Sequence, residues 1–125
     1  MTAVIRLTRD SVAAGDDCDA PHSRVERLGN SIRTPEDLQD AVARIAVAYL
    51  PSVAGQASWA AYSRLPIAVL SNDGSAVRKL WLMRDDLRRL DIRSGELHLH
   101  YVYLGTRDPE VAFDLISCTM SAFRS

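Results

Sequence analysis

Alternation of apolar and polar residues predicts strands near the start of the chain. Residues 3–8 place Ile5 and Leu7 on one side and Arg6 on the other, which is the pattern of a half-buried strand. Residues 23–28 alternate more weakly and predict a second strand. Between them lies a segment punctuated by Gly, Asp and Pro, which favours a loop.

The middle of the chain predicts three more strands. Residues 58–63 and 66–71 are rich in Trp, Tyr, Ile and Val and are too short for helices. Asn72, Asp73 and Gly74 favour a hairpin turn because these residue types tolerate a positive φ. The apolar run within residues 77–83 then predicts a strand in a buried, central position.

The last strand is predicted over residues 96–104, after an irregular or one-turn helical link over residues 84–91 and a turn at Ser94–Gly95. Strand alternation puts Leu97 and Leu99 on one face of it and His98 and His100 on the other.

Two segments carry the signals of a helix N-terminus. Thr34 and Asp108 each precede a proline and an acidic residue, so that a capping side chain, a preset φ and a carboxylate meet at the positive end of the helix dipole. The first helix ends at Pro51 and has an apolar stripe of Leu38, Ala41, Val42, Ile45 and Tyr49. The stripe of the second comprises Ala112, Leu115, Ile116, Thr119, Met120 and Phe123.

This order of elements predicts an α+β fold. We expect a two-layer sandwich, with a mainly antiparallel sheet of five or six strands and two helices on one face. The 125 residues contain no repeat and no Gly- or Ser-rich linker, so residues 1–125 are expected to form a single domain.

Composition and charge narrow the functional classes. The 15 basic and 16 acidic residues give a net charge of -1, which makes nucleic acid an unlikely partner. No segment has the length of a membrane span, and no apolar leader precedes Arg6. Cys18 and Cys118 form no disulfide framework, so we expect a cytoplasmic protein with free thiols.

The segment from Gly15 to His22 is the most unusual stretch. Asp16, Asp17 and Asp19 bring three carboxylates close to His22, but their spacing does not match a calcium-binding loop. A solvated loop with capping aspartates, a partner-binding surface that includes Arg24, and a metal site all remain open.

The histidines offer a second candidate site. His98 and His100 project from the same face of a strand, and a metal site with an open position would result if His22 lay opposite them. A solvent-exposed pair of imidazoles is the simpler interpretation, so no metal is predicted.

No catalytic residue or cofactor is predicted from the remaining sequence. Cys18 lies among aspartates, which disfavour a thiolate, and Cys118 is expected to be at least half-buried in the second helix. No nucleophile elbow and no phosphate-binding glycine loop occurs. Trp59 and Trp81 are expected to pack in the core or at an interface.

Two blocks carry a resemblance to a group of proteins. They are Leu7–Val12 with Gly15–Asp17 and Ala20–His22, and Tyr49–Pro51 with Trp59, Ser63 and Pro66–Val69. The chain resembles small uncharacterised bacterial proteins over its first half to two-thirds. Some acidic-loop proteins of this size are immunity proteins, and this likeness implies no catalytic residues.

Three functions follow as hypotheses. The first is a protein-binding domain, most concretely an immunity protein that occludes the active site of a bacterial toxin with a basic cleft. The second is a metal-dependent hydrolase or small-molecule-binding enzyme that uses His22, His98 and His100. The third is a homodimeric structural or regulatory module with an interface formed by Tyr101, Tyr103 or the tryptophans.

Overall fold

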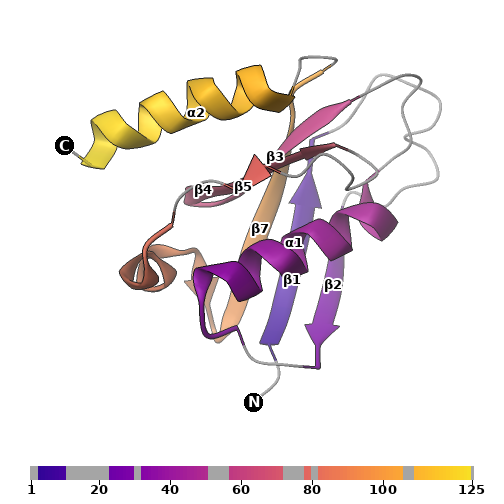
Figure 1. The fold of residues 1–125 in the computed structure, drawn as a ribbon. Coiled ribbons are helices and arrows are strands. Elements are labelled where there is room, and N and C mark those ends of the chain that lie inside the picture. The colour runs from indigo at the N-terminus through magenta and orange to yellow at the C-terminus, as the bar shows by residue number, and fades with distance from the viewer. Residues whose placement is uncertain are drawn as a thin grey trace.

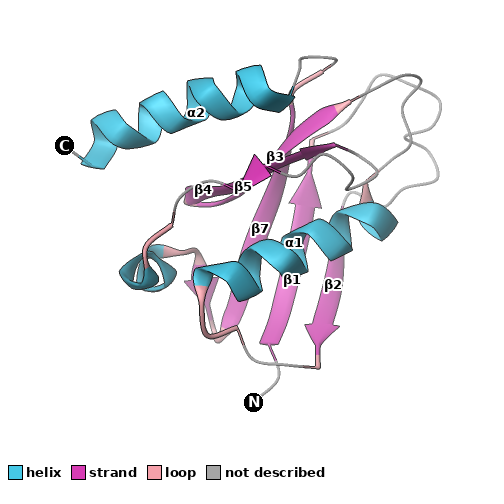
Figure 2. Cartoon of the chain, viewed as in Figure 1, coloured by secondary structure: helices cyan, strands magenta, loops and turns pink. Residues whose placement is uncertain are grey.

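The computed structural model describes residues 3–10, 23–29, 32–50, 57–71, 78–79, 82–105 and 109–124. These residues form a twisted sheet with helices packed against it (Figures 1 and 2). The elements in chain order are β1 (Ala3–Arg9), β2 (Ser23–Leu28), α1 (Pro35–Tyr49), β3 (Ser58–Ser63), β4 (Leu65–Ser71), β5 (Arg78–Lys79), a 3-10 helix (Arg84–Arg89), β6 (Ile92–Arg93), β7 (Glu96–Tyr103) and α2 (Pro109–Arg124).

The strands form one mixed sheet in the order β2-β1-β7-β3-β4-β5, and the short β6 pairs with β7. All pairs are antiparallel except β1 with β7, which is parallel. β7 is therefore central, with β1 along one side and β3 followed by β6 along the other. The predicted α+β class, with a mainly antiparallel sheet and two packing helices, is confirmed.

Helix α1 begins as the sequence predicts. The Thr34 hydroxyl accepts a hydrogen bond from the Asp37 N–H at 3.1 Å, and the Asp37 carboxylate accepts one from the Thr34 N–H at 3.2 Å. This capping box satisfies two backbone donors that the helix itself leaves unpaired. The predicted stripe from Leu38 to Tyr49 is buried and, apart from Ala41, belongs to the main core, together with Ile5 and Leu7 of β1 and with Leu97, Leu99 and Tyr101 of β7.

Helix α2 lies on the other side of β3 and β4. Trp59 and Ala61 belong to the main core, whereas Ala60 and Val69 form a second cluster with Ala112 of α2. Since neighbouring residues of a strand point to opposite faces, α1 and α2 cover opposite faces. Figure 1 shows α2 above β4 and α1 in front of β1 and β7. The structure thus corrects the expected two-layer arrangement with both helices on one face.

The physical reason for this correction is that β3 and β4 are buried on both faces. Every residue from Ser58 to Ala61 and from Ile67 to Ser71 is buried. Strands with such continuously apolar sequences are buried on both faces, so a helix is needed on each side of β3 and β4. In α2, Leu115 is 55% exposed, and the half-buried Phe113 packs against both clusters together with Ile116. The side chains of Thr119, Met120 and Phe123 lie outside the described set.

The segment after β4 differs most from the prediction. Within the expected strand over residues 77–83, the described residues form β5 at Arg78–Lys79, whereas Leu82 and Met83 lie in no strand, because the N–H of Met83, directly before the 3-10 helix, donates to the Asp86 carboxylate at 2.7 Å. Leu82 is nevertheless buried in the core. The turn at Ser94–Gly95 is confirmed, with φ of 54° and 77°. The turn at 72–75, Trp81 and residues 11–22 lie outside the described residues.

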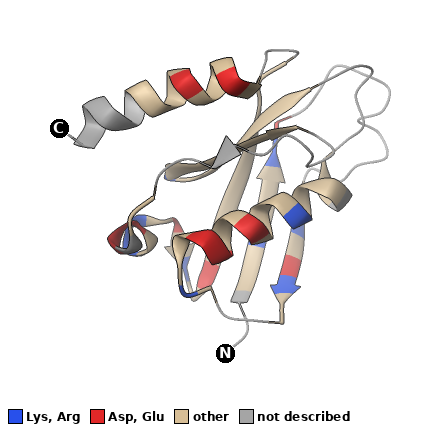
Figure 3. Cartoon of the chain, in the orientation of Figure 1, with Lys and Arg blue, Asp and Glu red and all other residues tan. Residues whose placement is uncertain are grey.

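Charge is unevenly distributed over the elements. Acidic and basic residues mark α1, β2 and the 3-10 helix, whereas β3 and β4 carry almost none (Figure 3). Among the described residues, no helix is long and apolar enough to cross a membrane.

Candidate functional site

The central strands carry a polar face on the side of the sheet opposite α1. Arg6 lies opposite His98, and Thr8 lies opposite His100, in the β1–β7 pair. On the other side of β7, Tyr62 lies opposite His100 and Arg93 lies opposite Glu96. Residues opposite one another share a face. We call this surface the polar face: Arg6, Thr8, Tyr62, Arg93, Glu96, His98 and His100.

A hollow of about 200 Å³ lies on the polar face. Its described lining includes the guanidinium groups of Arg6, Arg64 and Arg93, both imidazoles of β7 and the carboxylate of Asp91. The hollow thus combines several hydrogen-bond donors with one carboxylate. Alternation along β1 and β7 puts Arg6 and the two imidazoles on this side, because the neighbouring residues of these strands point into the core under α1.

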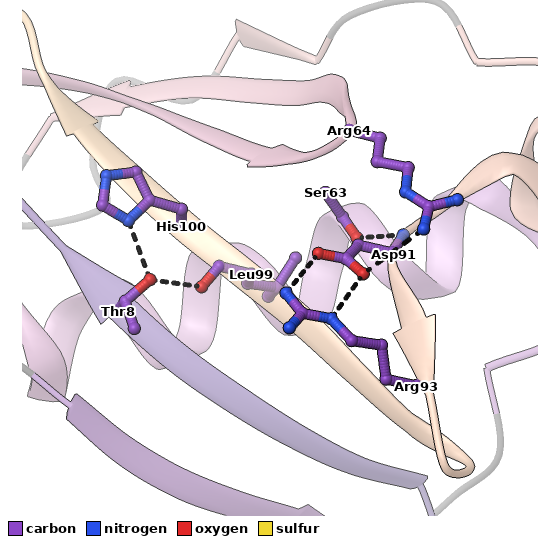
Figure 4. Close-up of polar contacts among 7 residues, drawn as sticks. All are labelled: Thr8, Ser63, Arg64, Asp91, Arg93, Leu99 and His100. Atoms are coloured by element: carbon purple, nitrogen blue, oxygen red, sulfur yellow. Dashed lines mark hydrogen bonds and ion pairs between the residues drawn. The ribbon is translucent and has the colours of Figure 1, made fainter.

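Asp91 organises one wall of the hollow (Figure 4). Its carboxylate accepts two hydrogen bonds from Arg93, at 3.0 Å from Nε and 2.9 Å from Nη2, and lies 3.8 Å from Nη2 of Arg64. Its N–H donates to the Ser63 hydroxyl at 2.8 Å, which fixes the segment to the end of β3. The hydrogen bonds from Arg93 hold the pKa of Asp91 below its usual value, with smaller electrostatic contributions from Arg64 and His98.

Arg64 occupies an unusual backbone position. It is the single residue between β3 and β4, and its φ is 64°. This left-handed conformation favours glycine and is strained for a residue with a Cβ. The Arg64 side chain is 65% exposed at the rim of the hollow. The chain therefore carries a guanidinium group at a position where glycine would remove the backbone strain.

A chain of hydrogen bonds runs from Asp10 through His100 to Thr8. One Asp10 oxygen lies 2.8 Å from Nε2 of His100, and the other accepts the Tyr103 N–H at 3.0 Å. The second ring nitrogen of His100, Nδ1, lies 2.7 Å from the Thr8 hydroxyl (Figure 4). That hydroxyl also lies 3.4 Å from the Leu99 carbonyl, a longer and weaker contact.

Of the three histidines considered as an alternative metal site, the structure describes two. His98 and His100 do share a face, as the strand pattern predicts. Both ring nitrogens of His100 are already hydrogen-bonded, so binding a metal would displace one of those partners. No cluster of three His, Cys, Asp or Glu side chains suited to a metal occurs within the described part of the chain. His22 lies outside it.

The predicted acidic surface falls almost entirely in undescribed sequence. Asp16, Asp17 and Asp19 lie outside the described residues, as does Cys18. Arg24 lies opposite Leu7 and thus on the α1 side of the sheet, where its Nε contacts Glu26 at 2.7 Å. It does not share the polar face with His98 and His100.

Two expectations about single residues are corrected. Cys118 is exposed rather than buried, because it lies on α2 away from the second cluster. Tyr101 is fully buried in the main core and contributes no surface for a second copy of the chain, whereas Trp59 packs in the core as expected. The hydroxyl of Tyr101 donates to the Val42 carbonyl at 2.9 Å, which satisfies it within the core.

Sequence reasoning missed Thr8, Asp10 and Arg64 as site residues. The sequence does place Thr8 on the polar side of the first predicted strand, where a site residue could lie. What the sequence does not show is the parallel pairing that sets Thr8 and Asp10 beside His100, about 90 residues later. Comparison of the chain with protein-family models, with curated proteins and with solved structures finds no match.

Proposed function

We propose that the chain is a protein-binding domain, most concretely an immunity protein that blocks the active site of a cognate bacterial toxin. The observation that carries the proposal is the polar face, which extends over β1, β7, β3 and β6 and displays paired charges around a shallow hollow. Such a surface suits the broad, charged contact of one protein with another.

The size of the two hollows lined by described residues favours contact with side chains of a protein over binding of a drug-sized molecule. Pockets for small molecules commonly enclose roughly 300–1,000 Å³. The hollow on the polar face is about 200 Å³, and a second hollow between the end of β2 and α1 is about 170 Å³. Each is too small for a drug-sized molecule and large enough for one or two side chains of a partner.

The acidic segment supplies the second part of the proposal. Residues 11–22 connect β1 to β2, so both ends of this segment attach where Asp10 and Ser23 lie. We assign Asp16, Asp17, Asp19 and His22 to the contact with a basic cleft, and Arg24 borders it. Charge complementarity of this kind mainly speeds association and selects the partner.

Co-expression tests the proposal. The chain is produced together with the toxic domain encoded beside its gene, and growth of the host is measured. We expect the wild-type chain to restore growth and the triple variant Asp16→Ala, Asp17→Ala, Asp19→Ala to lose most of this protection. A triple variant of the exposed residues Glu36, Asp85 and Asp114 removes the same charge elsewhere and should still protect.

The growth test distinguishes a wrong immunity function from a wrong contact segment. If the wild-type chain gives no protection, or if no toxic domain is encoded there, the immunity function is wrong. If the Asp16, Asp17 and Asp19 variant protects as well as the wild type, the acidic segment is not the contact, and the polar face becomes the surface to mutate.

A further inference from the structure

Asp10, His100 and Thr8 form an ordered network whose groups are all accessible. The side chains of His100 and Asp10 are 43% and 41% exposed, and Thr8 is exposed as well. Exposed ion pairs and hydrogen bonds of this kind add little to stability, about 0–1 kcal/mol. The stability of the fold therefore does not account for the alignment of a carboxylate, an imidazole and a hydroxyl.

The network favours one tautomer of the neutral imidazole. An ionised carboxylate only accepts hydrogen bonds, so Nε2 of His100 donates to Asp10. Nδ1 then carries the lone pair, and the nearest donor to it is the Thr8 hydroxyl at 2.7 Å. Asp10 is held in turn by the Tyr103 N–H at 3.0 Å. A base oriented by a carboxylate and aimed at a hydroxyl is the arrangement that activates a nucleophile.

Cationic donors stand beside the hydroxyl. Thr8 and His100 line the same hollow as Arg6 and Arg64. Guanidinium groups stabilise the oxyanion that forms when a hydroxyl attacks an acyl carbon. They also attract a substrate that carries a carboxylate or phosphate group.

We infer that Thr8 is the nucleophile of a second activity, the hydrolysis of carboxylic esters that carry an anionic group. The Thr8 oxygen attacks the acyl carbon while Nδ1 of His100 takes the hydroxyl proton. The bond to the leaving oxygen then breaks, and that oxygen takes the proton from Nδ1. Water attacks the acyl-threonine by the same route, which returns the proton to Thr8 and releases the acid. Asp10 acts as a positioning residue.

Acetyl transfer from p-nitrophenyl acetate provides the test. We expect nitrophenol release with an acetyl group on Thr8, located by peptide mass mapping. Thr8→Val has nearly the same shape without the hydroxyl and should lower the rate by roughly 100-fold, the usual contribution of a positioned base. Thr8→Ser keeps the hydroxyl and should retain the reaction. Lys79 is the only lysine in the chain, so acetylation of amines is easily separated from the signal.

Two further measurements separate the roles. Asp10→Asn should slow acetylation of Thr8 and change the imidazole tautomer seen by nitrogen NMR, whereas a role in folding alone would lower the melting temperature without slowing acetylation of the folded protein. Arg64→Gly removes a guanidinium and relieves the positive φ, so the fold should tolerate it. We expect it to abolish a preference for the anionic mono-p-nitrophenyl succinate over the acetate.

The inference is overturned if folded Thr8→Val, checked by its melting temperature, reacts as fast as the wild type. It is equally overturned if acetyl groups occur only on Lys79, the N-terminus or the cysteines. Neither result bears on the proposed toxin binding, which is measured by growth rescue.

Discussion

Successive residues of β7 lie on two very different surfaces. Leu97, Leu99 and Tyr101 point into the core under α1, and all three are buried. His98 and His100 point to the polar face, where each is about half-buried and within reach of charged side chains from β1 and β6. One strand therefore provides both the packing of the sheet and its chemistry.

The difference teaches where stability and function reside in this chain. The α1 side is closed by apolar contacts, including a tilted pair of Tyr49 and Tyr101 rings 5.7 Å apart. The polar face is held by hydrogen bonds and ion pairs between accessible groups, which are weak in water. We therefore expect changes on the α1 side to alter folding and changes on the polar face to alter binding or reactivity.

The largest expected effect comes from neighbouring residues of β7. Leu99→Ala removes a side chain that is 1% exposed and should destabilise the fold by about 3 kcal/mol, through lost burial and a cavity. His98→Ala, one residue away, should change stability by no more than about 0.5 kcal/mol. Urea unfolding measures both. Similar losses for the two variants would break the contrast between the faces.

A smaller effect is expected at alkaline pH. Burial raises the pKa of Tyr49 to about 12, although Arg9 and Arg24 partly oppose the shift, and burial raises that of Tyr101 further. The unfolded chain loses these protons first, near pH 10. The stability they contribute is therefore present below about pH 10 and lost as the pH rises through about 12.

Unfolding midpoints measured up to about pH 11 check this dependence. Tyr49→Phe should make the stability less sensitive to alkaline pH. Tyr62 lines the hollow on the polar face, and burial raises its pKa less, so Tyr62→Phe should have the weaker influence. A stronger effect of Tyr62→Phe would mean that the tyrosine on the polar face is more shielded from water than Tyr49 in the core.

The cap of α1 comes next in size. Thr34→Ala removes the acceptor of the Asp37 N–H and should cost about 1 kcal/mol. Thr34→Ser is the matched control and should retain nearly all the stability. The hydrogen bonds from the Arg33 and Thr34 N–H groups also lower the pKa of Asp37, so the contribution of this cap should fade as acid protonates that carboxyl.

Local signals in the sequence were sufficient for most elements. The Thr34–Pro35 start, the stripe of α1, the alternation of β1 and β7 and the turn at Ser94–Gly95 each depend on residues close together in the chain. Two features needed more than local reading. The apolar run at 80–83 predicts a strand, but Leu82 and Met83 lie in none, because the N–H of Met83 donates to the Asp86 carboxylate.

The candidate site depends on the pairing of two strands that lie far apart in the sequence. For this reason the sequence predicted the two histidines of the site but not their partners. Alternation alone places His98 and His100 on one face. The partners of His100 are Thr8 and Asp10, and they reach it only because β1 pairs parallel with β7. Arg64 lines the hollow with its backbone at a positive φ. A sequence predicts such a conformation only where it has glycine or asparagine, so an arginine gave no signal for it.

The smallest predicted effect compares matched ion pairs on the two sides of the sheet. On the polar face, Nε of Arg6 lies 2.9 Å from Glu96, with side chains 50% and 26% exposed. On the α1 side, Nε of Arg24 lies 2.7 Å from Glu26, with side chains 39% and 27% exposed. Their similar geometry and exposure make each the control for the other.

Glu96→Gln and Glu26→Gln should each cost about 0.2–1 kcal/mol, and the loss should shrink as salt screens the charges. Urea unfolding at low and high salt measures both. Equal, salt-sensitive losses would mean that charge pairs contribute alike wherever they are exposed, and that the stability of the α1 side comes from its apolar contacts. A loss above about 2 kcal/mol for Glu96→Gln alone would instead show that the polar face helps to hold the sheet together.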